Sequence, residues 1–207
     1  MRHAARQLGL PFRQRGGARA GSGPKPKNGK PGLPHQARPP HAARHPVHVS
    51  LKVGAALPNL RGPRCFTVVA AALRAGGERP GFRLVHWSVQ SNHLHLVVEA
   101  EDKALLWRGL RGLQTRIAMR LNRALGRKGR VFHDRYHAHA LRSPREAARA
   151  LEYVLRNFKH HLERQGYLVP GDARDACASS AWPPPGEPAA VRPRTWLLAV
   201  GWKRGAS

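Results

Sequence analysis

Two apolar segments in the middle of the chain constrain its fold most strongly. "FRLVHWSVQ" (82–90) and "HLHLVVEA" (93–100) are rich in Val, Leu and aromatic residues, and only Ser91 and Asn92 separate them. Such residues favour the pleated surface of a sheet, and a polar connection of two residues is typical of a tight turn between antiparallel strands. The sequence therefore predicts a β-hairpin here, and with it an antiparallel sheet.

The neighbouring segments carry further signals of secondary structure. Alternation of polar and apolar residues indicates a strand, whereas Ala and Leu content, leucines at helical spacing or a Ser-Pro-x-Glu start indicates a helix. These patterns place strands over 45–53 and 129–141, and helices over 65–77, 103–126 and 143–165. The first six elements follow the order of a ferredoxin-like fold, so we predict an α+β protein whose antiparallel sheet has helices on one face.

Composition divides the chain into three parts. Residues 1–45 are rich in Gly, Pro, Arg and Lys, contain no acidic residue and show no apolar period, so we expect a disordered basic arm. We expect one folded domain over 46–170, followed by a linker and a short C-terminal strand or docking segment over 171–207. Cys65 and Cys177 are the only cysteines and lie in unlike contexts, which predicts two free thiols.

The charge balance indicates a polyanionic partner. Lys and Arg number 37 against 11 Asp and Glu, a formal net charge of +26. Nucleic acid is the first candidate, because neutralised phosphates release condensed counterions, and an anionic membrane surface is the alternative. The chain has no long uncharged apolar segment and no secretory signal at its start, so we expect a cytoplasmic protein without a membrane partner.

Basic residues that could contact DNA lie in the arm, on the helix over 103–126 and, as Arg130 and Arg135, in the segment after that helix. Those in the arm resemble residues of short chains that follow DNA grooves, although a solubilising tail is an equal alternative. Those of the helix over 103–126 lack balancing acids, which favours phosphate contacts over a merely solvated face. Trp87 and Trp107 could stack on unpaired bases or pack in the core. The candidate DNA-contacting residues are Arg15, Arg19, Lys25, Lys27, Arg108, Arg111, Arg116, Arg120, Arg123, Arg130 and Arg135.

The second strand of the hairpin carries two histidines one residue apart, His93 and His95. Alternate residues of a strand point to one face, with their β-carbons about 7 Å apart, so both imidazoles can reach one metal ion. This pattern is weak by itself, because exposed histidines on a polar sheet face look the same. His137 and His139 form a second such pair, preceded by Tyr136, and remain an alternative site.

The surroundings of the first pair resemble a known family. "SNHLHLVVE" is similar to the "PNHVHLLV" type of motif in the single-tyrosine HUH transposases, above all the REP-associated tyrosine transposases. "EYVLRN" is similar to their helix motif, in which a tyrosine precedes an amide by four positions, and "GRVFHDRYHAHAL" is similar to their "GHVWQGRYKS" segment. The likeness covers about residues 46–168. It departs at Gln90-Ser91, where Met-Pro is usual, and at Phe158, where Pro is frequent.

This resemblance implies a chemistry for particular residues. His93, His95 and Asn157 would hold Mg²⁺ or Mn²⁺, and Tyr153 would attack DNA to give a 5′-phosphotyrosine and a free 3′-hydroxyl. Tyr153 and Asn157 lie four positions apart, hence on one helix face, so both can reach the same phosphate. The implied substrate is single-stranded or hairpin DNA, which the enzyme would cleave and rejoin without ATP, and paired sites in a homodimer would suit two breaks.

Two other classes of protein remain compatible with the sequence. One is a non-catalytic, domesticated nucleic-acid binder on the same fold. The other is a metal-dependent phosphodiesterase that activates water and would not need Tyr153. Tyr153 itself could instead be a core aromatic, since aromatic residues at helical spacing are mostly buried.

Overall fold

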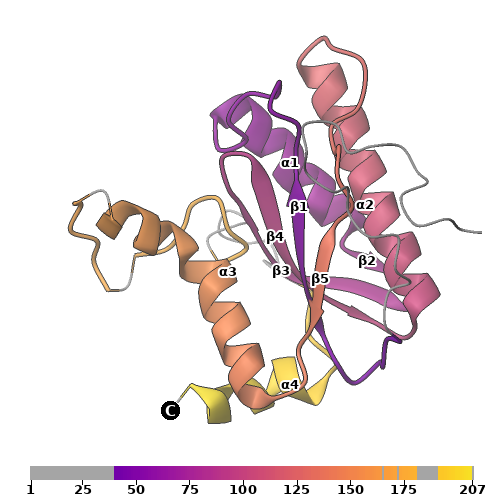
Figure 1. Ribbon diagram of the computed structural model, residues 1–207, viewed down its shortest axis with the longest axis vertical. Coiled ribbons are helices and arrows are strands. Elements are labelled where there is room, and N and C mark those ends of the chain that lie inside the picture. Colours follow the sequence, from indigo (N-terminus) through magenta and orange to yellow (C-terminus); the bar gives the residue numbers. More distant parts are fainter. Residues whose placement is uncertain (1–39, 165, 172, 181–190, 207) are drawn as a thin grey trace, which may run out of the picture. The chain divides into compact units, whose positions relative to one another are not determined.

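Five antiparallel strands form one sheet, in the order β2-β3-β4-β1-β5 (Figure 1). Without the two-residue β2, this is the strand order of a ferredoxin-like sheet, and the predicted α+β class and hairpin are confirmed. The strands are β1 (Val47–Lys52), β2 (Glu78–Arg79), β3 (Phe82–Val89), β4 (His93–Ala100) and β5 (His137–Ala140).

The computed structural model describes residues 40–164, 166–171, 173–180 and 191–206. They belong to a unit that begins at Pro40. Most of the predicted basic arm therefore lies outside the described residues, as do its candidate DNA contacts Arg15, Arg19, Lys25 and Lys27. No helix among the described residues is long and apolar enough to cross a membrane.

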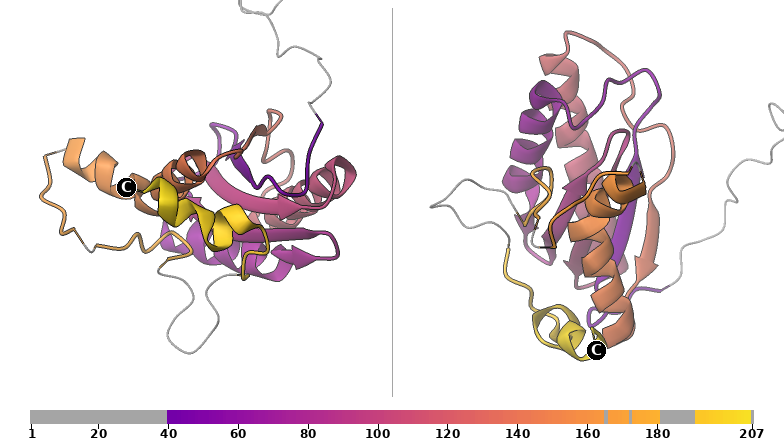
Figure 2. Two further views of the ribbon diagram at one scale, coloured as in Figure 1. Left: turned by 90° about the horizontal axis from the view of Figure 1, so that it is seen from below. Right: turned by 90° about the vertical axis from the view of Figure 1, so that its left-hand side faces the viewer.

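Helices cover both faces of the sheet. α1 (Pro63–Gly76) and α2 (Lys103–Ala124) pack on the face toward which Leu94 and Leu96 point. α3 (Pro144–Arg164) packs on the opposite face, where Val97 meets the buried side of that helix. The expectation of helices on one face thus holds for α1 and α2, while α3 lies apart from them (Figure 2). A central strand buried on both sides explains why "HLHLVVEA" is apolar almost throughout.

The predicted cap of α3 is present. The Ser143 hydroxyl accepts a hydrogen bond from the Glu146 backbone N–H at 3.2 Å. The Glu146 carboxylate in turn accepts the backbone N–H of Arg142 at 2.5 Å. Ala147, Ala150, Leu151 and Val154 then line the buried side of the helix at helical spacing. α3 therefore starts at a fixed point, and Tyr153 follows in its third turn.

The predicted strand over 129–141 is shorter than expected. Regular pairing covers only β5, and Phe132 forms a single bridge to Val53. The register with β1 ends at the pair of Ser50 and His137, although β1 itself continues to Lys52.

The C-terminal segment docks on the start of α3 as a helix rather than a strand. It forms α4 (Trp196–Ala199) and the 3₁₀ helix η2 (Gly201–Gly205), and Leu198 joins the core beneath α3. A β-carbon at Gly205 would lie 2.4 Å from the Pro144 carbonyl oxygen, so only glycine permits this close approach. Thr195 and Arg194 are held by the buried Glu99 carboxylate, which accepts both of their backbone N–H groups.

Candidate functional site

The two histidines of β4 lie beneath α3. His95 is 4% exposed and His93 is half-buried, and their Nε2 atoms are 2.9 Å apart. Their rings meet edge to face with centroids 4.6 Å apart. The alternation of β4 predicted this shared face, and it sends Leu94 and Leu96 into the core on the other side.

Neighbouring side chains orient both imidazoles. The Nδ1 of His93 lies 2.8 Å from the side-chain Oδ1 of Asn92, so this nitrogen donates and Nε2 is the acceptor nitrogen of the ring. The Nδ1 of His95 lies 3.0 Å from the Ser50 hydroxyl and 3.3 Å from the Nε2 of His48. Such partners on the far nitrogen are what hold metal-binding histidines in place.

The histidine pair fits a divalent cation. The 2.9 Å between the two Nε2 atoms suits either a hydrogen bond between the rings or one metal ion that contacts both nitrogens. Nitrogens at this separation can both lie about 2.1 Å from one ion at nearly a right angle, as octahedral coordination requires. Within the described residues, no cluster of three or more His, Cys, Asp and Glu side chains is arranged to hold a metal.

Tyr153 lies against His95 of this pair. Its ring meets His95 edge-on, with centroids 4.8 Å apart and planes at 75°, and meets His48 at 5.8 Å. The side chain is 43% exposed, so it is not a core aromatic. Asn157 follows on α3 one helical turn later; its backbone is helical and its side chain lies outside the described part of the structure.

The other two phenols are placed differently. Tyr136 is partly buried and packs against the core between the sheet and α1 and α2. Tyr167 follows α3 and is 62% exposed. The alternative site of Tyr136 with His137 and His139 is therefore not assembled, because its phenol packs into the main core.

The second histidine pair shares the sheet face of the first. His137 is the register partner of Ser50, and His139 that of His48. Because Ser50 also pairs with His95, the two pairs lie two strands, or about 10 Å, apart. A groove of about 430 Å³ runs from Tyr153 past His48 and His139 to Arg149.

His48 and Ser50 are site residues that we did not predict. Their alternation in "HPVHVSLKV" places them on one face of a strand, but only the pairing of β1 with β4 brings them to His95. Burial, and secondarily the nearby charge of His139, lowers the pKa of His48 below its ordinary value. This imidazole is consequently neutral near pH 7.

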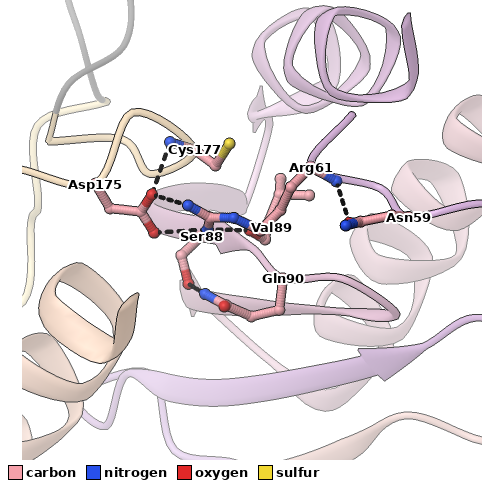
Figure 3. A network of polar contacts seen from close by, with 7 residues as sticks. All are labelled: Asn59, Arg61, Ser88, Val89, Gln90, Asp175 and Cys177. Atoms are coloured by element: carbon pink, nitrogen blue, oxygen red, sulfur yellow. Dashed lines mark hydrogen bonds and ion pairs between the residues drawn. The ribbon is translucent and has the colours of Figure 1, made fainter. Parts of the chain in front are cut away.

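A polar network holds the turn of the hairpin from outside (Figure 3). The Arg61 guanidinium donates to the Val89 carbonyl at 2.9 Å and to both oxygens of the buried Asp175 carboxylate at 2.7 and 3.0 Å. The Gln90 amide donates to the Ser88 hydroxyl, and Ser88 is the strand neighbour of His95. The network fixes the end of β3 from which the chain turns into His93.

The segment around Cys177 covers the free edge of β3. The backbone carbonyl of Cys177 accepts the Val89 N–H at 2.8 Å, and the Ser179 N–H donates to the Trp87 carbonyl at 2.9 Å. Asp175 anchors this segment by accepting the Cys177 N–H. Both predicted free thiols are present and buried, and burial raises the pKa of Cys65 and of Cys177.

The candidate DNA-contacting arginines that line α2 are not near the histidine pair. Arg108, Arg111, Arg116 and Arg120 line a separate groove on α2, on the far side of the sheet from α3. Arg123 is exposed at the end of α2, and Arg130 and Arg135 are exposed in the segment before β5. Of the two tryptophans considered, Trp87 is a core residue, 4% exposed, and Trp107 is 48% exposed.

Comparison with known proteins finds only distant structural likeness. No protein-family model and no curated protein matches the chain. One similar solved structure is a REP-associated tyrosine transposase bound to a REP hairpin, 14% identical with a TM-score of 0.46, covering 66% of this chain and 76% of that one. Another is a candidate transposase from Deinococcus radiodurans R1, 16% identical with a TM-score of 0.41, covering 65% of this chain and 97% of that one.

Proposed function

We propose that this chain is a transposase-like DNA strand transferase that uses Tyr153 as its nucleophile. The observation that carries the proposal is the meeting of three side chains: an accessible phenol on α3 lies 4.8 Å, ring to ring, from His95, whose Nε2 faces that of His93 at 2.9 Å. A tyrosine that served only in core packing would be buried. Two histidines that only faced solvent would not bring their Nε2 atoms into contact.

The cofactor in this proposal is Mg²⁺ or Mn²⁺, held by His93, His95 and the amide oxygen of Asn157. When bound, such an ion neutralises charge on a phosphate oxygen and stabilises the transition state. His48 and Ser50 keep the His95 ring oriented through its Nδ1. Because the cap fixes the start of α3, it also fixes the position of Tyr153 relative to the sheet.

The reaction at Tyr153 is a phosphoryl transfer that conserves bond energy. The Oη of Tyr153 forms a bond to phosphorus as the bond from phosphorus to the 3′-oxygen breaks. The phenol releases its proton to solvent, and the departing 3′-oxygen takes one up. The product is a 5′-phosphotyrosine, and attack by a 3′-hydroxyl reverses the step, so rejoining requires no nucleotide cofactor. The substrate in this proposal is single-stranded or hairpin DNA, whose backbone can enter the groove beside Tyr153.

A covalent-adduct assay tests the proposal. The protein is incubated with Mn²⁺ and hairpin DNA labelled on the 3′ side of the cleavage point, and is then run on a denaturing gel. We expect a labelled band at the mass of protein plus DNA, its loss in Tyr153→Phe and on chelation, and its persistence in the matched control Tyr167→Phe. An adduct that survives Tyr153→Phe overturns the assignment. Cleavage without an adduct supports a water-using phosphodiesterase, and binding without cleavage supports a non-catalytic binder.

A further inference from the structure

A second groove lies on α2, on the far side of the sheet from Tyr153. Leu96 points into the core beneath α1 and α2, whereas the adjacent Val97 points into the core beneath α3. The sheet therefore separates α2 from α3. The groove has a volume of about 640 Å³ and opens on the outer surface of α2. It cannot be part of the site around His93 and His95.

The groove is lined by guanidinium groups that lack acidic partners. Five arginines contribute to it, and within the described residues none of them forms an ion pair. Guanidinium groups that line a groove without nearby carboxylates favour an anionic ligand, because they can form charge-assisted hydrogen bonds to its oxygens. The five are Arg79, Arg108, Arg111, Arg116 and Arg120.

One of these arginines packs against a glycine in the middle of the helix. A β-carbon at Gly112 would lie 2.6 Å from the Nη1 of Arg79, so the guanidinium from β2 rests against the bare backbone of α2. Glycine inside a helix costs about 1 kcal/mol relative to alanine. The sequence accepts this cost at a position where it brings a fifth positive charge into the groove.

The groove also offers a flat aromatic surface. The Arg111 guanidinium lies 5.0 Å from the centre of the Trp107 ring, and that indole is 48% exposed. An unpaired base can stack on an indole or continue a stack on a guanidinium plane. Guanidinium forks suit phosphate, and the groove contains arginine but no lysine.

We propose that this groove binds single-stranded nucleic acid, with a base stacked on the Trp107–Arg111 pair and phosphates held by the arginines. It would retain a strand independently of cleavage, on the surface opposite to the reacting phosphate. A groove lined by guanidinium groups around an exposed indole suits a nucleic-acid strand better than it suits a lipid surface. Binding to a lipid surface requires a continuous apolar patch on the protein.

Binding of a labelled oligothymidylate, followed by fluorescence anisotropy, tests this groove. The background is Tyr153→Phe, so that no covalent product forms. We expect Arg111→Ala with Arg120→Ala to weaken binding at least tenfold, and the slope of log affinity against log salt to fall by about 1.4. The matched control, Arg145→Ala with Arg174→Ala, removes the same charge from exposed positions outside the groove and should weaken binding less than about threefold.

Stacking is tested by replacing the indole. Trp107→Leu should weaken binding about tenfold, and Trp107→Phe should recover most of the loss. Equal weakening by the groove and control pairs, or no effect of Trp107→Leu, overturns the proposal. Binding of phosphatidylserine vesicles with the same dependence on these residues, without binding of the oligothymidylate, also overturns it. Because the Tyr153→Phe background removes the proposed catalysis from this measurement, a failure of the proposed catalysis would be seen separately in the adduct assay.

Discussion

The two faces of the sheet are built from alternate residues of the same strands, yet they present different chemistry. Beneath α3, the strands present histidines and serines to a phenol, and the apolar core there is small. Beneath α1 and α2, the strands β1, β3 and β4 present apolar residues, and the polar groups lie outside, as arginines in the groove on α2. We infer that one face is arranged for reaction and the other for stability and retention of a polyanion.

The largest effect should come from a histidine of the α3 face. We expect His95→Ala to slow adduct formation by about a thousandfold, because loss of a ligand removes several kcal/mol of charge stabilisation. Single-turnover rates with Mn²⁺ measure this. His137→Ala, an exposed histidine of the second pair, is the matched control and should retain most of the activity. Equal losses in both variants would remove the distinction between the two histidine pairs.

Core truncations should separate stability from activity. Leu113 of α2 is fully buried in the larger core, so Leu113→Ala should cost about 4 kcal/mol of unfolding free energy. Leu151 of α3 is 6% exposed in the smaller core, so Leu151→Ala should cost about 2 kcal/mol. Urea denaturation measures both. Under conditions where both variants are folded, only Leu151→Ala should slow adduct formation, because it loosens the helix that carries Tyr153.

The ion pair between Arg61 and Asp175 joins the α1 side of the molecule to the segment along β3. Asp175 is 1% exposed, and removal of Arg61 would leave its carboxylate buried without a cation. We expect Arg61→Met to cost about 3 kcal/mol in urea denaturation. Arg83→Met breaks a pair with the exposed Glu78 and should cost less than about 1 kcal/mol. Similar costs for both would mean that the network in Figure 3 does not support the hairpin.

The smallest effect should be on the pH dependence of stability, through His86 on the sheet face beneath α3. Burial lowers the pKa of His86 below its ordinary value of 6.5. The unfolded chain therefore takes up a proton before the folded one, so stability is complete above about pH 7 and falls as the pH drops through 6.5. Urea denaturation at pH 7.5 and pH 5.5 should show a smaller difference in His86→Gln than in the unchanged protein. An unchanged difference would show that His86 does not contribute.

Local patterns in the sequence predicted the elements and the shared face of the first histidine pair. Period-two alternation in "HLHLVVEA" is sufficient to send His93 and His95 one way and Leu94 and Leu96 the other. The cap of α3 was likewise visible in Ser143, because capping depends on residues only three positions apart.

Contacts between distant residues could not be predicted in this way. The partners of His95 come from β1, and their position depends on strand register, which no local pattern specifies. Arg61 and Asp175 are separated by 114 positions, and Arg79 reaches Gly112 from another element. The location of the arginine groove on the far face follows from which side of the sheet α2 covers. The sequence predicted basic residues on that helix, but it did not indicate which side of the sheet the helix covers.

The central claim is that Tyr153 carries the covalent link to DNA, and peptide mapping tests it most directly. The protein is incubated with hairpin DNA and Mn²⁺, digested with a protease and a nuclease, and the modified peptide is sequenced by mass spectrometry. The account predicts a nucleotide phosphate on the peptide containing "EYVLR", at Tyr153. A phosphate on Tyr136 or Tyr167, or on no tyrosine while DNA is cleaved, would contradict it.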